Sequence, residues 1–136
     1  MNRSSRIVIT LRTEAHRVMM DVTGHVQQSL HAMQAHDGLC MLFCPHTTSG
    51  LTINEGADPD VARDIEAALA RMVPVHSGFL HAEGNSDAHV KSTLTGVSLC
   101  VGVEAGHLAL GRWQRVFFCE FDGPRQRELW LRFIDA

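Results

Sequence analysis

Rough alternation of apolar and polar residues predicts a β-strand at residues 5–12, because successive side chains of a strand point to opposite faces. The unbroken apolar run at 39–44 predicts a strand that is covered on both faces. Further strands are expected at 16–22, 50–54, 97–103, 113–121 and 126–134. The turn Asp122-Gly123-Pro124-Arg125 is expected to join the last two strands as an antiparallel pair.

Apolar residues at helical spacing predict two main helices and a short third one. Thr23 is the expected N-cap of the first helix, which ends at Asp37-Gly38. Asp58-Pro59-Asp60 starts the second, because it combines a capping side chain, a proline suited to the first helical position and an acid near the positive end of the helix dipole. Met72 in that helix is expected to fill the core. The short helix is expected from Ala88 to Leu94.

Many strands with two main helices indicate an α+β fold whose sheet is mixed or mainly antiparallel. A length of 136 residues is typical of one domain, so residues 1–136 are expected to form a single one. The hydrophobic fraction of 45% and the charged fraction of 20% are those of an ordinary soluble protein. No apolar run is long enough for a membrane span, and the first residues do not resemble a signal peptide. We therefore expect a cytoplasmic protein that binds no membrane.

Charge and cysteine content exclude several classes of function. The net charge of −3 argues against nucleic-acid binding, which usually needs a basic surface. The four cysteines form no C-x-x-C pair and lie in apolar runs, so we expect them to be reduced and mostly buried. A catalytic thiol is a minor alternative for Cys44, which lies close to His46 in the sequence. Motifs for dinucleotides, nucleoside triphosphates and serine hydrolysis are missing from the sequence.

The segment His81-Ala-Glu-Gly-Asn-Ser-Asp-Ala-His-Val-Lys91 carries the densest group of polar side chains in the chain. Each of them would need a partner if it were buried, so the segment is either a solvated loop or a functional site. His46 follows the apolar run 39–44, where the end of a strand often places a functional group. Three neutral imidazoles, His46, His81 and His89, are what a divalent metal such as zinc requires.

Other polar residues have both a functional and a structural interpretation. Asp87 is either part of the site or the N-cap of the short helix, and Asn85 either binds a ligand or supplies a left-handed turn conformation. Asn54 and Glu55 either hold a ligand or close the turn before the second helix. Lys91 is a candidate partner for a phosphate or a carboxylate.

Five motifs, in order along most of the chain from residue 39 onward, resemble the YjbQ-like family, which is associated with secondary thiamine-phosphate synthase activity. They are His46-Thr-Thr-Ser-Gly-Leu-Thr-Ile-Asn-Glu55, Asp58-Pro-Asp-Val61, the segment from His81 to Lys91, Leu110-Gly-Arg-Trp-Gln114 and Glu120-Phe-Asp-Gly-Pro-Arg125. The chain departs from the family pattern at Phe79-Leu80, where a tyrosine is common.

The resemblance implies a compact α+β fold and a homotrimer with sites near the subunit boundaries. It also implies that His46, His81 and His89 group together on a metal. Further polar residues would surround them: Glu83, Asn85, Asp87, Lys91 and Arg125.

The hypothesis that follows is a small metal-dependent enzyme that acts on an anionic, phosphorylated small molecule. Glu83 or Asp87 would act as general base or orient a metal-bound water, and Asn54, Glu55 and Asn85 would contact the substrate. Lys91 and Arg125 would neutralise its charge. The family suggests a reaction that joins a pyrimidine-methyl diphosphate to a thiazole phosphate. This reaction would be either the main activity or a side activity. The alternative is a trimeric, non-catalytic protein that binds a small anion or metabolite.

Overall fold

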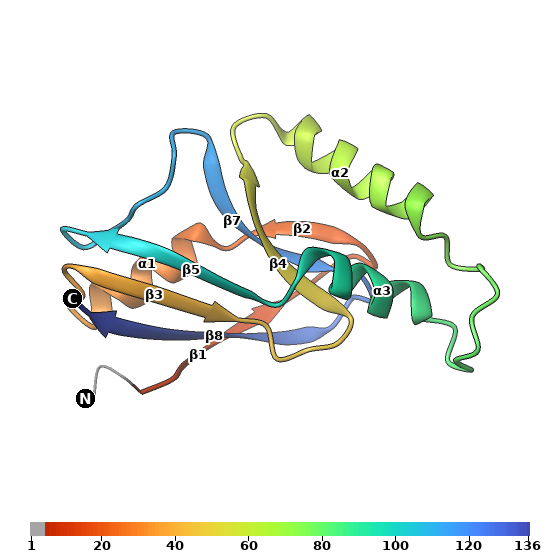
Figure 1. Ribbon diagram of the computed structural model, residues 1–136, viewed down its shortest axis with the longest axis horizontal. Coiled ribbons are helices and arrows are strands. Elements are labelled where there is room, and N and C mark those ends of the chain that lie inside the picture. The colour runs from red at the N-terminus through yellow and green to blue at the C-terminus, as the bar shows by residue number, and fades with distance from the viewer. Residues whose placement is uncertain (1–4) are drawn as a thin grey trace.

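The computed structural model describes residues 5–136 as two antiparallel sheets and three helices (Figure 1). The larger sheet has the strand order β1 (Ile7–Arg12), β8 (Gln126–Asp135), β3 (Gly38–Phe43), β5 (Ser98–Glu104) and β6 (His107–Leu108). The smaller sheet has the order β2 (Val18–Asp21), β7 (Gln114–Glu120) and β4 (Ser49–Glu55). The helices are α1 (Thr23–Ala32), α2 (Pro59–Met72) and α3 (Ser86–Thr95). The expected α+β fold with mainly antiparallel sheets is confirmed.

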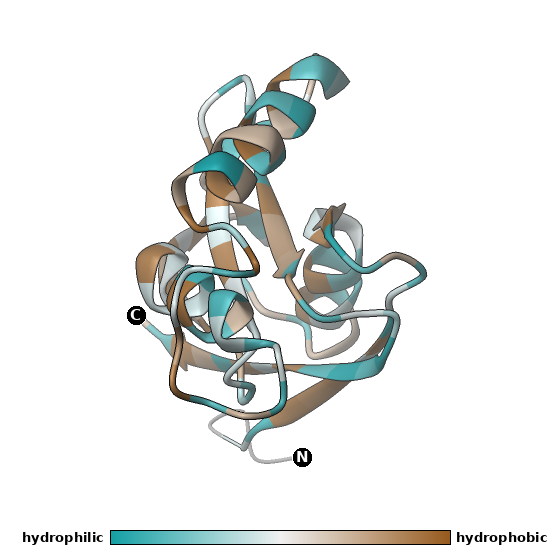
Figure 2. Ribbon diagram, turned by 90° about the vertical axis from the view of Figure 1, so that its right-hand side faces the viewer, coloured by the Kyte–Doolittle hydropathy of each residue, from teal (hydrophilic) through white to brown (hydrophobic). Residues whose placement is uncertain are grey.

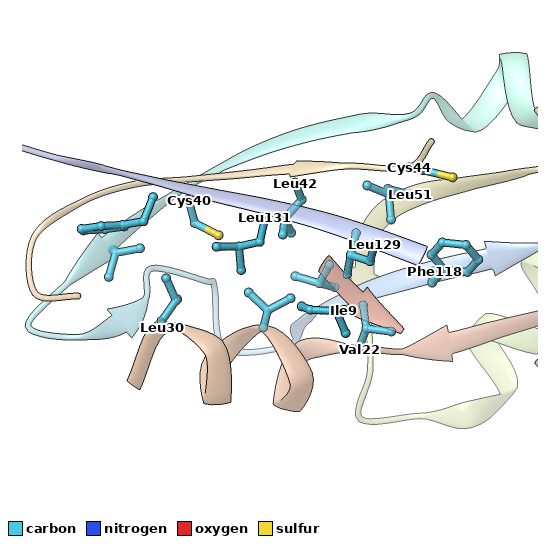
Figure 3. Packing of buried hydrophobic residues seen from close by; sticks show 14 of the residues in the cluster. Ile9, Val22, Leu30, Cys40, Leu42, Cys44, Leu51, Phe118, Leu129 and Leu131 are labelled. Atoms are coloured by element: carbon cyan, nitrogen blue, oxygen red, sulfur yellow. The ribbon is translucent and has the colours of Figure 1, made fainter. Parts of the chain in front are cut away.

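The main core lies between the larger sheet on one side and α1 with the smaller sheet on the other. Leu42, Leu129 and Leu131 of the larger sheet pack with Leu30 of α1 and Phe118 of β7 (Figure 3). All five side chains are almost completely shielded from water. Burial of one such side chain contributes about 1.5–3 kcal/mol, so this cluster is the main source of stability.

The outer face of the smaller sheet carries a second, smaller cluster. Phe117, Cys119 and Phe121 are its buried members on β7 and just beyond, and Ile65 and Leu69 of α2 pack against them. No residue of α2 is fully buried, and the helix stands apart from the larger sheet (Figure 1). Both hydrophobic and hydrophilic residues occur along α2 (Figure 2). The helix is therefore attached along one stripe only.

Three of the connections between the two sheets meet at one end of the molecule. They are residues 13–17 between β1 and β2, residues 44–48 between β3 and β4, and residues 121–125 between β7 and β8. Backbone hydrogen bonds join them: the N–H of Thr13 donates to Arg125, that of Gly123 to His16, and that of Phe121 to Thr48. The candidate site is built on this group of corners.

The expected pairing of the last two strands is wrong. β7 and β8 belong to different sheets, and β7 pairs with β2 and β4 while β8 pairs with β1 and β3. The turn at 122–125 has the composition of a hairpin turn, but its backbone bonds go to residues 13–17 instead. Long-range contacts therefore decide which sheet each strand joins.

Two expectations about burial are also wrong. β3 was expected to be covered on both faces, but its side chains alternate and Leu39, Met41 and Phe43 are exposed on the outer face of the larger sheet. Met72 was expected in the core, yet it is 68% exposed at the end of α2. In both cases apolar residues lie on surfaces that nothing in the single chain covers.

The helix starts agree with expectation only for α2. Asp58 caps this helix as predicted, because its Oδ1 accepts from the N–H of Asp60 at 2.9 Å, with Pro59 in the first turn. Thr23 is not a cap: the cap residue of α1 is Val22, and the Thr23 hydroxyl accepts from the N–H of Val116. Across residues 5–136, no helix has the length and apolar character needed to cross a membrane.

Candidate functional site

His46 lies on the corner between β3 and β4, where its ring packs edge-on against Phe118. Its Nε2 accepts a hydrogen bond from the backbone N–H of Glu128 at 2.9 Å. A nitrogen that accepts from an N–H carries no proton, so the neutral ring has its proton on Nδ1. Burial and the charge of Arg127 lower the pKa of His46. The corner therefore holds a neutral imidazole in one orientation and one tautomer.

A buried ion pair lies directly behind His46. Arg127, near the start of β8, donates to both carboxylate oxygens of Glu120, the last residue of β7. The same guanidinium donates to Thr48 Oγ1 at 2.8 Å, and the Thr13 hydroxyl donates to Glu120 at 2.7 Å. Each of these residues belongs to a different strand end or corner, so one charged pair links all three connections.

The protonation of Glu120 follows from its partners. Burial alone raises the pKa of this carboxyl, but the hydrogen bonds from Arg127, Thr13 and the N–H of Asp122 outweigh it and leave the pKa below its ordinary value. Glu120 is therefore ionised at neutral pH. The pair is satisfied on both sides, which a buried charge requires.

A second charged pair lies within α3. Asp87 is buried and accepts from Lys91 Nζ at 2.8 Å, one helical turn later. Asp87 is therefore not the N-cap of α3, a position that Asn85 occupies without a side-chain capping bond. Asn85 does not adopt a left-handed conformation either, since Gly84 before it supplies the positive φ. The tight Asp87–Lys91 pair explains why both polar groups tolerate burial.

Asn85 connects α3 to the corner at 121–125. Its amide donates to Asp122 Oδ2 at 2.9 Å, and Arg125 donates to the same oxygen at 3.0 Å. Burial raises the pKa of Asp122, but these two hydrogen bonds and the charge of Arg125 outweigh it and lower the pKa overall. The Oδ1 atom of Asn85 is buried without a hydrogen-bond partner among the described residues. This oxygen can accept from a ligand or a water.

His81 and His89 meet at the start of α3. Their ring centroids are 5.5 Å apart and the rings are nearly perpendicular. His81 belongs to the loop between α2 and α3, which faces the viewer in Figure 2. His81 Nε2 lies 3.9 Å from an oxygen of Glu83, whose side chain is exposed. Two of the three candidate histidines are therefore neighbours.

A groove of about 790 Å³ brings His89 together with His46. It runs between α3 and the corner at 44–48, with Ser92 and Thr93 on the helix side and Val97 below. The remaining lining residues are Phe43, Cys44, Pro45, Thr47, Gly96 and Trp130. The groove is mostly apolar with imidazoles and hydroxyls at a few points, as in many small-molecule sites. Lys91 points elsewhere, into a small cavity that it shares with Glu66 and Glu120.

The proposed metal set does not assemble in this arrangement. Within residues 5–136, no three His, Cys, Asp or Glu side chains are placed to hold a metal ion. His46 uses Nε2 for the Glu128 N–H and carries its proton on Nδ1, so neither nitrogen offers a free lone pair. Metal binding by His46, His81 and His89 stays a prediction.

Asn54 and Glu55 lie far from these histidines within the chain. They form the end of β4, which starts beside Thr48 and runs away from the corner to α2 (Figure 1). Asn54 Oδ1 accepts from the N–H of Glu55, and Glu55 accepts from the N–H of Ala57. These bonds match the structural interpretation, in which both residues close the turn before α2.

The cysteines, including the candidate thiol Cys44, are mostly buried and unreactive. Cys44 lines the groove, but burial raises the pKa of its thiol, which makes it a poor nucleophile. Burial also raises the pKa of Cys40 and of Cys119 to about 12, and all four cysteines are free. Cys100 is exposed, whereas the other three are buried as expected.

Comparison with known proteins identifies the family. The model of the UPF0047 protein YjbQ-like family matches residues 7–136. The chain belongs to the UPF0047 family. A UPF0047 protein of Methanocaldococcus jannaschii is 42% identical over 124 residues, which cover 91% of this chain and 90% of the relative. The UPF0047 protein YugU of Bacillus subtilis is also 42% identical, over 93% of this chain and 96% of its own length.

Solved structures of UPF0047 proteins have the same fold. A protein of the family from Clostridium acetobutylicum is 44% identical, with a TM-score of 0.91 over 94% of this chain and 99% of its own. A conserved hypothetical protein from Thermus thermophilus is 48% identical, with a TM-score of 0.89 over 94% and 99%. These likenesses confirm the family that the five motifs indicated, while the names of these proteins state no reaction.

Sequence reasoning missed the Glu120–Arg127 pair of this UPF0047 chain. Arg127 is one of five arginines near the end of the chain, together with Arg112, Arg115, Arg125 and Arg132, and such a group is typical of a solvated strand face. Arg127 is instead 4% exposed. The available signal was Glu120 at the head of the motif that ends with Arg125, a carboxylate in an otherwise apolar run. A buried charge of that kind requires a partner.

The tautomer of His46 can be tested in solution. We expect a single neutral tautomer with the proton on Nδ1 and a pKa below the ordinary value of 6.5, because burial and Arg127 disfavour the charged ring. Nitrogen-15 NMR of the imidazole rings measures both properties, and the His46→Gln variant assigns the signal. A proton on Nε2 would contradict the hydrogen bond from Glu128, and a pKa of 6.5 or higher would contradict the effect of burial and Arg127.

Proposed function

We propose that this UPF0047 protein is an enzyme that acts on a small anionic molecule, such as a phosphate ester, in the groove between α3 and the corner at 44–48. One observation carries the proposal: His46 and His89 line the same groove, and His46 is held as a neutral N–H donor by a buried charge network. A buried ion pair is often no more stabilising than a hydrophobic pair of similar volume, so stability alone does not account for this network. Orienting an imidazole is a purpose that would account for it.

The residues support acid–base chemistry at the groove. His46 Nδ1–H donates to a ligand oxygen, and His89 is available to take or give a proton. The hydroxyls of Thr47 and Thr93 add donors for an anionic group. Lys91 and Arg125 are each paired with a carboxylate, so their charge acts on the ligand from a distance rather than by contact. Glu83 is exposed beside His81 and is free to assist it.

A divalent metal such as zinc remains part of the proposal for His81 and His89 only. Their rings are adjacent, whereas His46 would bind a metal only after losing its bond from Glu128. A metal held there would supply a Lewis acid beside the groove. Thiamine-phosphate synthesis, as a main or side activity, is one reaction of the proposed class and would use the same groove.

The proposal is tested by turnover of a panel of small phosphate esters. We expect product to accumulate with time and enzyme concentration, and His46→Gln or His89→Gln to lower the rate by about 10²–10⁴-fold, the usual contribution of a general acid or base. The control is His25→Gln, which changes an exposed histidine on α1 outside this groove.

Two results would contradict the enzyme proposal. Rates that both groove variants leave unchanged would place the chemistry elsewhere. A signal that stops at one equivalent of ligand per chain would favour the second candidate function, a non-catalytic binding protein for a small anion. The mostly apolar, open groove is compatible with that candidate, which needs no acid or base.

We also propose that further copies of the chain cover the outer face of the larger sheet, in a homotrimer as the family resemblance implies. Leu39, Met41 and Ile134 form an exposed apolar surface there. Apolar surfaces of this kind mark contacts between proteins. A location in the cytoplasm, where thiols stay reduced, suits the four free cysteines.

Light scattering tests the assembly. We expect three chain masses for the natural protein and a shift toward one chain for Leu39→Glu, because Ile134 and Gly102 lie opposite this position and a buried charge there would have no partner. Arg63→Glu, an exposed change on α2, should keep the trimer. A natural protein with the mass of one chain would overturn the assembly proposal.

A further inference from the structure

Two aromatic side chains line the groove that holds His46 and His89. Phe43, at the end of β3, and Trp130, on β8, are cross-strand partners. Their ring centroids are 5.8 Å apart and the ring planes are tilted by 33°. Phe43 is 43% exposed, which is a large apolar area to leave in water. The groove therefore has an aromatic wall, formed by Phe43 and Trp130, beside its polar groups.

The wall is held in a fixed orientation. The indole N–H of Trp130 donates to Glu128 Oε1 at 2.9 Å, and the guanidinium carbon of Arg6 lies 3.9 Å from the centroid of the Trp130 ring. A cation over an aromatic face is a favourable contact. Glu128 also donates its backbone N–H to His46. One residue therefore fixes both the aromatic wall and the imidazole, which sets their relative position.

We propose that the groove selects ligands that carry a flat aromatic ring next to their anionic group, with Phe43 and Trp130 as the residues that determine this specificity. The inference rests on the proposed function, in which the polar side chains of the groove contact the anionic group of the ligand. Aromatic rings attract one another in offset or edge-to-face geometry beyond the effect of buried area alone. A saturated ring of the same size has no such attraction to Phe43.

The aromatic wall is the part of the outer face of the larger sheet that borders the groove. Phe43 and Trp130 line the groove, whereas Met41, two residues earlier on the same face of β3, does not. A change at Met41 therefore alters the outer face without altering the lining of the groove. This difference supplies a matched control variant.

The test compares two phosphate esters of the same charge and similar size, phenyl phosphate and cyclohexyl phosphate. We expect calorimetry to show about fivefold tighter binding of phenyl phosphate, the preference that one aromatic contact typically gives. Phe43→Leu should abolish this preference while cyclohexyl phosphate binds as before. Met41→Leu should keep the preference of the natural protein.

Four results would overturn the inference. Equal affinity of the natural protein for both esters, or a preference that survives Phe43→Leu, would remove the role of the wall and leave the proposed function intact. Weaker binding of both esters together with dissociation of the oligomer in Phe43→Leu would make the wall a contact between chains. Binding of neither ester, with unchanged NMR signals of His46, would overturn the proposed function as well.

Discussion

The ion pair between Glu120 and Arg127 is the interaction on which the organisation of the site depends. Glu120 ends β7 in the smaller sheet, and Arg127 is the second residue of β8 in the larger sheet, so the pair joins the two layers. Thr13 and Thr48 bind the same two charges from the other corners. Loss of one partner would leave a buried charge unpaired, which typically costs about 3–5 kcal/mol. The ion pair therefore holds the three corners in one arrangement, and loss of either charge would disrupt all three.

The position of His46 is a consequence of this constraint. Its corner is held by Thr48, and its ring accepts from the residue that follows Arg127 in β8. Burial and the nearby positive charge lower the pKa of the ring and keep it neutral, and the hydrogen bond selects the tautomer. A hydrophobic pair in place of Glu120 and Arg127 would hold two layers together equally well. It would supply neither the charge nor the polar contacts that orient the imidazole.

Local patterns predicted the local structure well and the long-range structure poorly. Asp58 was recognisable as a cap because its partner lies two residues away, and alternation located β1 without any knowledge of its neighbours. The turn at 122–125 was predicted to be a hairpin turn, but it is hydrogen-bonded to Thr13 and His16. These partners lie more than 100 residues earlier in the sequence, so no local pattern shows the contact. Sheet membership is thus not encoded locally.

For the candidate site, too, the sequence predicted the local features and not the long-range contacts. His46, His81 and His89 stood out by residue type, and the structure brings them to one region. Nε2 of His46 is already occupied by a hydrogen bond from a backbone N–H. The sequence could not show this bond, because every residue except proline has a backbone N–H that can donate. The exposed apolar residues of β3 were read as buried for a similar reason, since one chain does not display what covers them.

NMR of the His46 ring in the charge-free double variant Glu120→Leu/Arg127→Met tests the central claim most directly. Removing both charges together avoids an unpaired buried ion, so the variant is expected to fold. If the pair orients His46, both neutral tautomers become populated. The pKa of the ring also rises but stays below 6.5, because burial remains while the effect of Arg127, which is larger than the opposite effect of Glu120, is gone. An unchanged pKa with the proton still on Nδ1 would contradict the account, because the imidazole would then be held without the ion pair.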